Sequence, residues 1–146
     1  MPRLFIVATP IGNLSDISAR ALQTLRDCDL IAAEDTRVTR ALLNHFEIDT
    51  PCVSNHQHNE ENRAAPIVAR MLEEDLDVAL VTDAGTPCIS DPGSFLAKEA
   101  AAAGIEVLAV PGPTAMASAL SVSGIDTREF AFYGFLPRQK RELSEK

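Results

Sequence analysis

The stretch LVTDAGTPCISDPG, residues 80–93, joins an apolar run to a loop rich in glycine and proline. The run that it completes, DVALVT at 77–82, is typical of a strand buried on both faces of a parallel sheet. After the loop at 83–93, we expect a helix over 94–103 that ends at Gly104. This order of strand, loop and helix predicts one unit of an α/β fold.

The same alternation extends outward from this unit toward both ends of the chain. Further apolar runs predict strands at 4–9, 29–34, 52–54, 106–110 and 130–135. Helix-period segments predict a helix capped by Ser18 and ending near Cys28, one capped by Thr36 and ending near Phe46, one over 60–74, and one from the turn at 111–113 to about Val122. We therefore predict an α/β fold with a single, mostly parallel sheet of about five strands, flanked by helices.

The composition changes abruptly near the end of the chain. The tail LPRQKRELSEK at 136–146 carries four basic residues and two glutamates and has no apolar period. We therefore expect one domain over residues 1–135, followed by a linker over 136–146 toward a second domain that this chain does not contain.

Charge and composition exclude several classes of protein. The 146 residues include 13 Lys plus Arg and 21 Asp plus Glu, a formal net charge of −8, which disfavours nonspecific binding to nucleic acid. The apolar runs are too short to cross a bilayer, and MPRLFIVATP at the N-terminus lacks the cleavage site of a secretory signal. The three widely spaced cysteines indicate reduced thiols rather than disulfides or a metal site. We expect a cytoplasmic protein without a membrane partner.

Three loops that follow expected strands combine glycine with proline, and they point to a ligand site. They are TPIGNL at 9–14, DAGTPCISDPG at 83–93 and PGPTA at 111–115. Ligands of open parallel sheets bind beyond the carboxyl ends of the strands, where these loops would meet. Neither GxGxxG nor GxxxxGK[ST] occurs, so an ordinary phosphate cradle is excluded. The alternative is that glycine and proline only form tight connections in these loops.

Six short motifs together resemble one known family. VATPIGNL, AAEDTR, HNE, LVTDAGTPCISDPG, PGPTA and GFLP stand at 7–14, 32–37, 58–60, 80–93, 111–115 and 134–137. This pattern resembles the tetrapyrrole (corrin/porphyrin) methylase family, and within it the branch that acts on small-subunit ribosomal RNA. The resemblance covers essentially the whole chain but not the family's second domain.

The resemblance implies a two-domain transferase that binds S-adenosylmethionine between its domains and methylates the 2′-hydroxyl of a cytidine in small-subunit (16S) rRNA. It also implies a homodimer, and residues 1–146 alone are not expected to transfer a methyl group. The cofactor-binding residues that it implies lie in the three loops. They are Ile11, Gly12, Asp83, Ala84, Gly85, Thr86, Ile89, Thr114 and Ala115.

Two departures from the family pattern bear on the substrate. Members that act on porphyrins have Gly-Pro-Gly-Asp after the first strand, where this chain has PIGN at 10–13, and their loop aspartate is replaced by Thr86. Both departures favour RNA over a tetrapyrrole. A tetrapyrrole methylase and a non-catalytic binding module of the same fold remain the alternatives.

Candidate catalytic residues lie in polar loops, because a ribose hydroxyl is a weak nucleophile that benefits from a proton acceptor. The candidates are Glu34, Asp35, His58 and Glu60, and no metal is expected. The alternative for Glu34 and Asp35 is charge that complements a helix dipole, and for His58 a solvated turn.

Arginines near these loops are the candidates for RNA contact. Arg37, Arg40 and Arg63 flank the candidate substrate loops and could form a local positive patch on an acidic chain. The alternative is that they belong to ordinary solvated helix faces.

Overall fold

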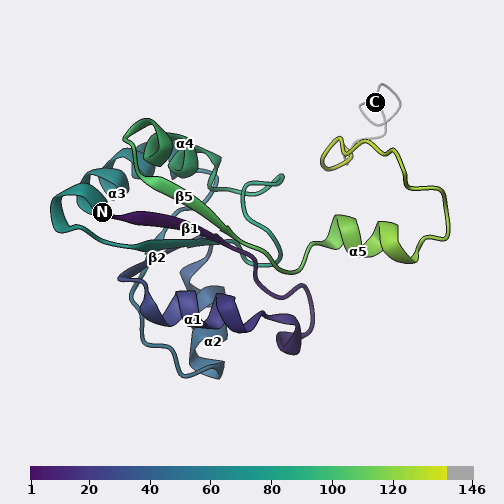
Figure 1. Cartoon of the computed structure of the whole chain (residues 1–146), viewed down its shortest axis with the longest axis horizontal. Coiled ribbons are helices and arrows are strands. Elements are labelled where there is room, and N and C mark those ends of the chain that lie inside the picture. The colour runs from purple at the N-terminus through teal and green to yellow at the C-terminus, as the bar shows by residue number, and fades with distance from the viewer. Residues whose placement is uncertain (138–146) are drawn as a thin grey trace. The chain divides into compact units, whose positions relative to one another are not determined.

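The computed structural model describes residues 1–137, apart from the side chain of Glu60. The chain forms two compact units, Met1–Ala115 and Met116–Lys146. The first unit contains a five-stranded sheet in the order β3-β2-β4-β1-β5, in which every neighbouring pair is parallel (Figure 1). Its strands are β1 (Arg3–Val7), β2 (Leu30–Ala33), β3 (Cys52–Ser54), β4 (Val78–Val81) and β5 (Glu106–Val110). The predicted α/β class and parallel sheet are confirmed.

Helices cover both faces of this sheet. The helices are α1 (Ala19–Asp27), α2 (Thr36–His45), α3 (Glu60–Glu74) and α4 (Ser94–Ala102), with a short 3-10 helix η1 (Leu14–Asp16) after β1. α1 and α2 lie on one face, and α3 and α4 lie on the other (Figure 1). Along β4, Val78 and Leu80 pack under α3 and α4, whereas Ala79 and Val81 pack under α1 and α2. All four are buried, as expected of a parallel strand covered on both faces.

Most predicted helix bounds agree with the structure. The Ser18 hydroxyl caps α1 by accepting a hydrogen bond of 2.9 Å from the Ala21 amide. The helix predicted over 60–74 is observed as α3 with these bounds. The predicted cap of α2 was wrong, because Asp35 and not Thr36 is the N-cap and accepts from the Arg37 amide at 2.9 Å. A carboxylate makes a stronger, charge-assisted cap than a hydroxyl.

The strand predicted at 130–135 was also wrong. Helix α5 (Ala115–Val122) agrees with the prediction, but after it no strand forms in the part of the chain that the structure describes. The side chains of Phe130, Phe132 and Phe135 are 48–78% exposed. Aromatic content favours a strand, but a strand also needs a neighbour for its backbone groups, and no described strand pairs with this segment. Most of the expected linker at 136–146 lies outside the described residues, and the domain limit at 135 stays a prediction.

Candidate functional site

The carboxyl edge of the sheet brings the three glycine-proline loops together. Because β4, β1 and β5 are neighbours, the loops that follow them emerge side by side. The Thr9 amide donates to the Gly85 carbonyl at 2.9 Å, and the Gly85 amide donates to the Thr9 carbonyl at 3.1 Å. The Thr86 hydroxyl donates to the Pro113 carbonyl at 3.1 Å. The predicted adjacency of 83–93 and 111–115 is confirmed.

Glycine is required at two points of this junction. Gly85 has φ +87°, a conformation that disfavours side chains, and a Cβ there would lie 3.4 Å from Ile11 Cγ2 and 3.8 Å from the Pro113 carbonyl oxygen. At Gly112, a Cβ would approach the Ala8 Cβ to 3.0 Å. Both glycines let the loops lie close together with their backbone near the surface.

The residues predicted to bind cofactor lie along this junction with different exposures. Ile11 and Ile89 are 38% and 50% exposed, which is unusual for isoleucine. Gly12 and Ala84 are exposed, and Thr86 and Thr114 are half-buried. The loops at 83–93 and 111–115 contain no lysine or arginine. An uncharged or cationic ligand therefore suits this surface better than a phosphate does.

Carboxylates gather where β2 and β4 end. Glu34 Oε2 accepts from the Thr82 hydroxyl at 2.6 Å and from the Asp83 amide at 3.1 Å. Asp83 Oδ1 in turn accepts from the Asp35 amide at 3.1 Å. Partial burial raises the pKa of Asp83, and the nearby negative charge of Glu34 raises it further. The same two causes raise the pKa of Asp91. This edge therefore holds an excess of negative charge.

Asp35 differs from its acidic neighbours because Arg37 neutralises it. The Arg37 guanidinium donates to both Asp35 oxygens, at 3.1 and 2.8 Å. These hydrogen bonds, with one from the Arg37 amide, lower the pKa of Asp35 to about 2. The Arg37 side chain is 89% exposed. Asp35 therefore caps α2 and forms an ion pair with Arg37. This is close to the alternative interpretation, in which its charge complements the dipole of the helix.

A polar cleft of about 420 Å³ brings several of the candidate residues together. It is lined by Glu34, Asp35, Thr36, Arg37, Ser54, His56, His58 and Asp83. The His58 amide donates to His56 Nδ1 at 3.2 Å, which fixes the turn between them. The candidate side chain of Glu60 lies outside the described residues, although its backbone begins α3.

The three candidate arginines have different surroundings. Only Arg37 lines the polar cleft. The guanidinium of Arg40 donates to the Thr50 carbonyl at 3.0 Å and to the Cys52 sulfur at 3.2 Å, so it joins α2 to β3. Arg63 is exposed on α3. The geometry thus separates one cleft residue, one packing residue and one surface residue.

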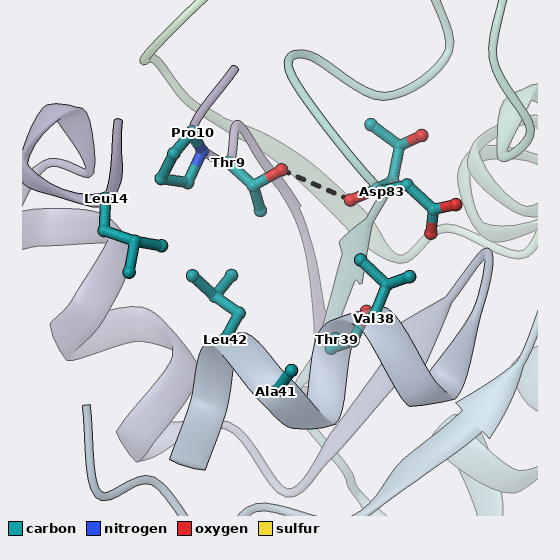
Figure 2. Close-up of a pocket in the computed structure, with 9 residues that line it drawn as sticks. Thr9, Pro10, Leu14, Val38, Thr39, Ala41, Leu42 and Asp83 are labelled. Carbon is teal, nitrogen blue, oxygen red and sulfur yellow. Dashed lines mark hydrogen bonds between the residues drawn. The ribbon is translucent and has the colours of Figure 1, made fainter. Parts of the chain in front are cut away.

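A second, largely apolar cavity of about 260 Å³ adjoins the cleft, and sequence analysis missed it (Figure 2). Its walls come from Thr9, Pro10, Leu14, Val38, Thr39, Ala41, Leu42, Thr82 and Asp83. Asp83 lines both the cavity and the cleft. The available signal was the spacing of Val38, Ala41 and Leu42, a second apolar stripe on α2 beside the buried pair Thr39 and Leu43.

Comparison with known proteins agrees with this arrangement. The profile described as Tetrapyrrole (Corrin/Porphyrin) Methylases matches residues 3–145. The chain belongs to this family. It is 55% identical over 134 residues to "Ribosomal RNA small subunit methyltransferase I" of Xylella fastidiosa, covering 92% of this chain and 49% of the relative. Proteins of the same name from Halalkalibacterium halodurans and Thermotoga maritima are 51% and 53% identical, and the match covers 95% and 96% of this chain and 48% and 63% of those proteins. The chain thus spans about half the length of most of these curated relatives.

Solved structures of the tetrapyrrole methylase fold superpose on the chain. A conserved hypothetical protein from Aeropyrum pernix K1 gives a TM-score of 0.71 at 24% identity, over 89% of this chain and 45% of that one. The uroporphyrin-III-C-methyltransferase of Thermus thermophilus gives 0.62 at 22% identity, over 88% and 55%. At these identities the likeness establishes the fold alone.

One buried polar side chain of this family member stands out beside the cleft. Asn55, which follows β3, is 0% exposed, and neither its Oδ1 nor its Nδ2 has a hydrogen-bond partner in the described chain. Its chain neighbours Ser54 and His56 line the cleft.

Within residues 1–137, no group of three or more His, Cys, Asp or Glu side chains is arranged to hold a metal. No helix there has the length and apolarity needed to span a membrane.

Proposed function

We propose that this chain is the N-terminal half of an S-adenosylmethionine-dependent methyltransferase that modifies the ribose 2′-hydroxyl of a cytidine in small-subunit rRNA. The observation that carries the proposal is the hydrogen-bonded junction of the loops after β1, β4 and β5, with an acid-lined cleft beside it. The names of relatives about 50% identical to the chain support the class of substrate. We further propose that the enzyme acts in the cytoplasm as a homodimer, with the small ribosomal subunit as its partner.

The chemistry of the loop junction suits S-adenosylmethionine. This cofactor carries a positive sulfonium and no phosphate, and the loops offer backbone groups, exposed isoleucines and carboxylates without any lysine or arginine. Ile11, Gly12, Ala84, Gly85, Thr86, Ile89, Thr114 and Ala115 would hold it, with Asp83 at the border of the cleft. When bound, the cofactor supplies an electrophilic methyl group on its sulfonium.

The chain's own carboxylates can then take up the proton of the ribose hydroxyl. A base is more effective when its pKa lies nearer the working pH, and the pKa of Asp35, about 2, makes that residue a poor acceptor. Glu34 Oε2 is already bound by two donors. Asp83 lines the cleft and has a raised pKa, so among these carboxylates it is the best suited to receive the proton. His58 remains a second candidate in the lining of the cleft.

The experiment is a methyl-transfer assay with the full-length enzyme and cofactor labelled in its methyl group. Small ribosomal subunits, protein-free rRNA and a porphyrinogen are offered in parallel. We expect label in the rRNA of the subunits, at a cytidine whose 3′-phosphodiester resists alkaline hydrolysis. Label in the porphyrinogen would favour the tetrapyrrole alternative, and cofactor binding without transfer to any substrate would favour a binding module.

A further inference from the structure

The loop between β3 and α3, residues 55–59, is held in one shape by the side chain of Asn59. Its Oδ1 accepts from the His56 amide at 2.8 Å, and its Nδ2 donates to the Ser54 hydroxyl oxygen at 3.3 Å. The Asn59 amide also donates to the His56 carbonyl at 2.9 Å, which closes a turn. Asn59 is the N-cap of α3, yet its side chain makes no capping hydrogen bond to the helix. An N-cap asparagine usually accepts from helix amides, so here the side chain supports the loop instead.

This loop fixes which ring nitrogen of His56 carries a hydrogen. The His58 amide donates to His56 Nδ1 at 3.2 Å, and an amide N–H can only donate. Nδ1 is therefore the unprotonated nitrogen of the neutral ring, and Nε2 carries the hydrogen. His56 is half-buried and lines the polar cleft. It therefore offers an N–H donor to the cleft, and its one lone pair is already used within the loop.

Hydrogen-bond donors and acceptors reach the cleft from different strands. Ser54 and His56 come from the end of β3, and the Ser54 hydroxyl, which accepts from Asn59, can donate its own hydrogen to a ligand. Glu34 and Asp83 follow β2 and β4, and both are acceptors when ionised. The strand order is β3-β2-β4 with neighbours about 4.8 Å apart, so the ends of β3 and β4 lie about 10 Å apart. The cleft therefore suits a ligand with acceptor oxygens on one side and a hydroxyl on the other.

We propose that Ser54 and His56 bind the phosphodiester on the 3′ side of the ribose that is methylated, and that Asn59 positions both donors. This inference rests on the proposed function, which it deepens by assigning a site for the RNA backbone. In RNA, the 2′-hydroxyl and the 3′-phosphodiester are attached to neighbouring carbons of one ribose. A phosphate oxygen bound on the β3 side therefore directs the hydroxyl toward Asp83 on the β4 side, where its proton is taken up.

The charges of the cleft indicate that this contact orients the substrate more than it attracts it. The lining contains the carboxylates of Glu34, Asp35 and Asp83 against the single guanidinium of Arg37, which is paired with Asp35. A phosphodiester is therefore held there by hydrogen bonds rather than by net charge. Phosphate contacts fix the register of a nucleic acid on a protein, and the orientation of reacting groups sets the rate. Within a whole ribosomal subunit, loss of this contact should lower kcat more than it raises KM.

The first test determines the tautomer of His56 directly. Full-length enzyme with isotope-labelled histidine nitrogens is studied by NMR at mildly alkaline pH, where an ordinary histidine is neutral. We expect the proton–nitrogen correlations of His56 to be those of a ring protonated at Nε2, and Asn59→Ala to give a mixture of both tautomers. Asn62→Ala, at an exposed asparagine of α3, is the matched control and should leave His56 unchanged. A ring protonated at Nδ1 in the unsubstituted enzyme would overturn the proposal.

The second test compares two isomers that differ only in the position of the phosphate. Cytidine 3′-monophosphate and cytidine 5′-monophosphate are titrated into the cofactor-saturated full-length enzyme while the Nε2–H resonance of His56 is followed. Base and charge are the same in both, so neither contributes to the difference. We expect the 3′ isomer to shift this resonance and to bind roughly tenfold more tightly, the scale of one hydrogen bond to a charged acceptor. Equal affinities, or binding of the 3′ isomer without a shift at His56, would overturn the proposal.

Variants of His56 separate the hydrogen bond from the shape of the loop. His56→Phe keeps a ring but removes the N–H, whereas His56→Gln keeps an N–H in about the place of Nε2–H. With small ribosomal subunits as substrate, we expect kcat of His56→Phe to fall at least tenfold with KM within about threefold, and His56→Gln to recover most of this loss. His45→Phe, at an exposed histidine of α2, is the matched control and should change neither constant. Equal losses in His56→Phe and His56→Gln would indicate a purely structural role and overturn the proposal, even if neither mononucleotide binds.

These outcomes distinguish the phosphate site from the proposed function. The tautomer and the nucleotide affinities are measured without methyl transfer. If the 3′ isomer binds at His56 but no rRNA is methylated, the proposed function fails and the phosphate site stands. If rRNA is methylated but the two isomers bind alike and His56→Phe keeps full activity, the function stands and the phosphate site fails.

Discussion

Thr9 and Gly85 exchange two backbone hydrogen bonds, an isolated antiparallel bridge between the loops that follow two parallel strands. The bridge holds the start of the loop after β1 against the first turn of the loop at 83–93. It needs the left-handed backbone of Gly85, whose φ is +87°. The positions of these two loops, and of the cofactor-binding surface that we propose for them, therefore depend on Gly85.

Gly85→Val is the direct test of this dependence. A β-branched residue at positive φ is strained, and its side chain would press on Ile11 and Pro113, so we expect stability to fall by about 1–3 kcal/mol and cofactor affinity to fall at least tenfold. Gly104→Val is the matched control, because Gly104 has φ +77° with nothing within 4 Å of its Cβ position. Calorimetry and urea unfolding of the full-length enzyme measure both quantities. Equal cofactor affinity in the two variants would remove Gly85 from the site.

The charge on Glu34 should be visible in the titration of Asp83. Burial is the larger cause of the raised pKa of Asp83 and Glu34 the next, so Glu34→Gln should lower that pKa without restoring its ordinary value. A raised folded-state pKa adds stability at low pH that is lost as pH rises through it, and this pH dependence should weaken in the variant. Carboxyl NMR titration measures the shift. Glu74→Gln, on α3, should leave Asp83 unchanged.

Arg37 should control the acid titration of Asp35. The pKa of Asp35 is lowered to about 2, so its ionised form contributes stability that is present above the ordinary value and lost as pH falls through about 2. In Arg37→Ala we expect the pKa of Asp35 to rise and acid unfolding to begin at higher pH. Arg128→Ala removes a pair of the same spacing, with Asp126, and serves as control. A pKa of Asp35 that stays near 2 in Arg37→Ala would assign the shift to backbone donors instead.

Much of this fold follows from local patterns in the sequence. Val78 to Val81 are all apolar and covered on both faces, and the period of Ala64, Ile67, Val68 and Met71 gives the buried face of α3. Such patterns are local, so they predict element type and order. The segment at 130–135 failed because strand formation depends on a partner strand, which no local pattern reports.

The site was less predictable because it depends on contacts between distant residues. The loop motifs indicated which loops meet, and strand order confirmed it. Three features depend on side-chain geometry, which sequence spacing does not contain. They are the ion pair of Asp35 with Arg37, the packing role of Arg40, and the position of Asp83 in the lining of both the cleft and the cavity. The apolar cavity was missed because Leu14 and Leu42 look like ordinary core residues until their exposure is known.

Arg37 and Arg63 give the prediction that bears most on RNA binding. Because the chain carries a net charge of −8, rRNA binding requires local cations; Arg37 lines the polar cleft and Arg63 is exposed on α3. We expect Arg37→Ala with Arg63→Ala to lower methylation of ribosomal subunits. The slope of the logarithm of the binding constant against the logarithm of the salt concentration should become shallower by roughly 0.7–0.9 for each phosphate that is no longer neutralised. Cofactor affinity should stay within about threefold. Arg20→Ala with Arg70→Ala is the charge-matched control, and an equal decrease in both double variants would attribute the effect to net charge.

The buried side chain of Asn55, beside the cleft, is expected to lower the free energy of unfolding. Its buried amide has no partner in the described chain, and an unsatisfied buried polar group costs about 1–3 kcal/mol. Asn55→Leu replaces the amide with an apolar group of similar shape and keeps the 2.7 Å backbone hydrogen bond from the residue 55 amide to the Ala33 carbonyl. We therefore expect the free energy of unfolding to rise by about 1 kcal/mol in urea, whereas Asn44→Leu, at an exposed position of α2, should change it by less than about 0.5 kcal/mol. A decrease of stability in Asn55→Leu would mean that the amide is hydrogen-bonded in solution, and its neighbours Ser54 and His56 would then lie on a more polar and more hydrated wall of the cleft.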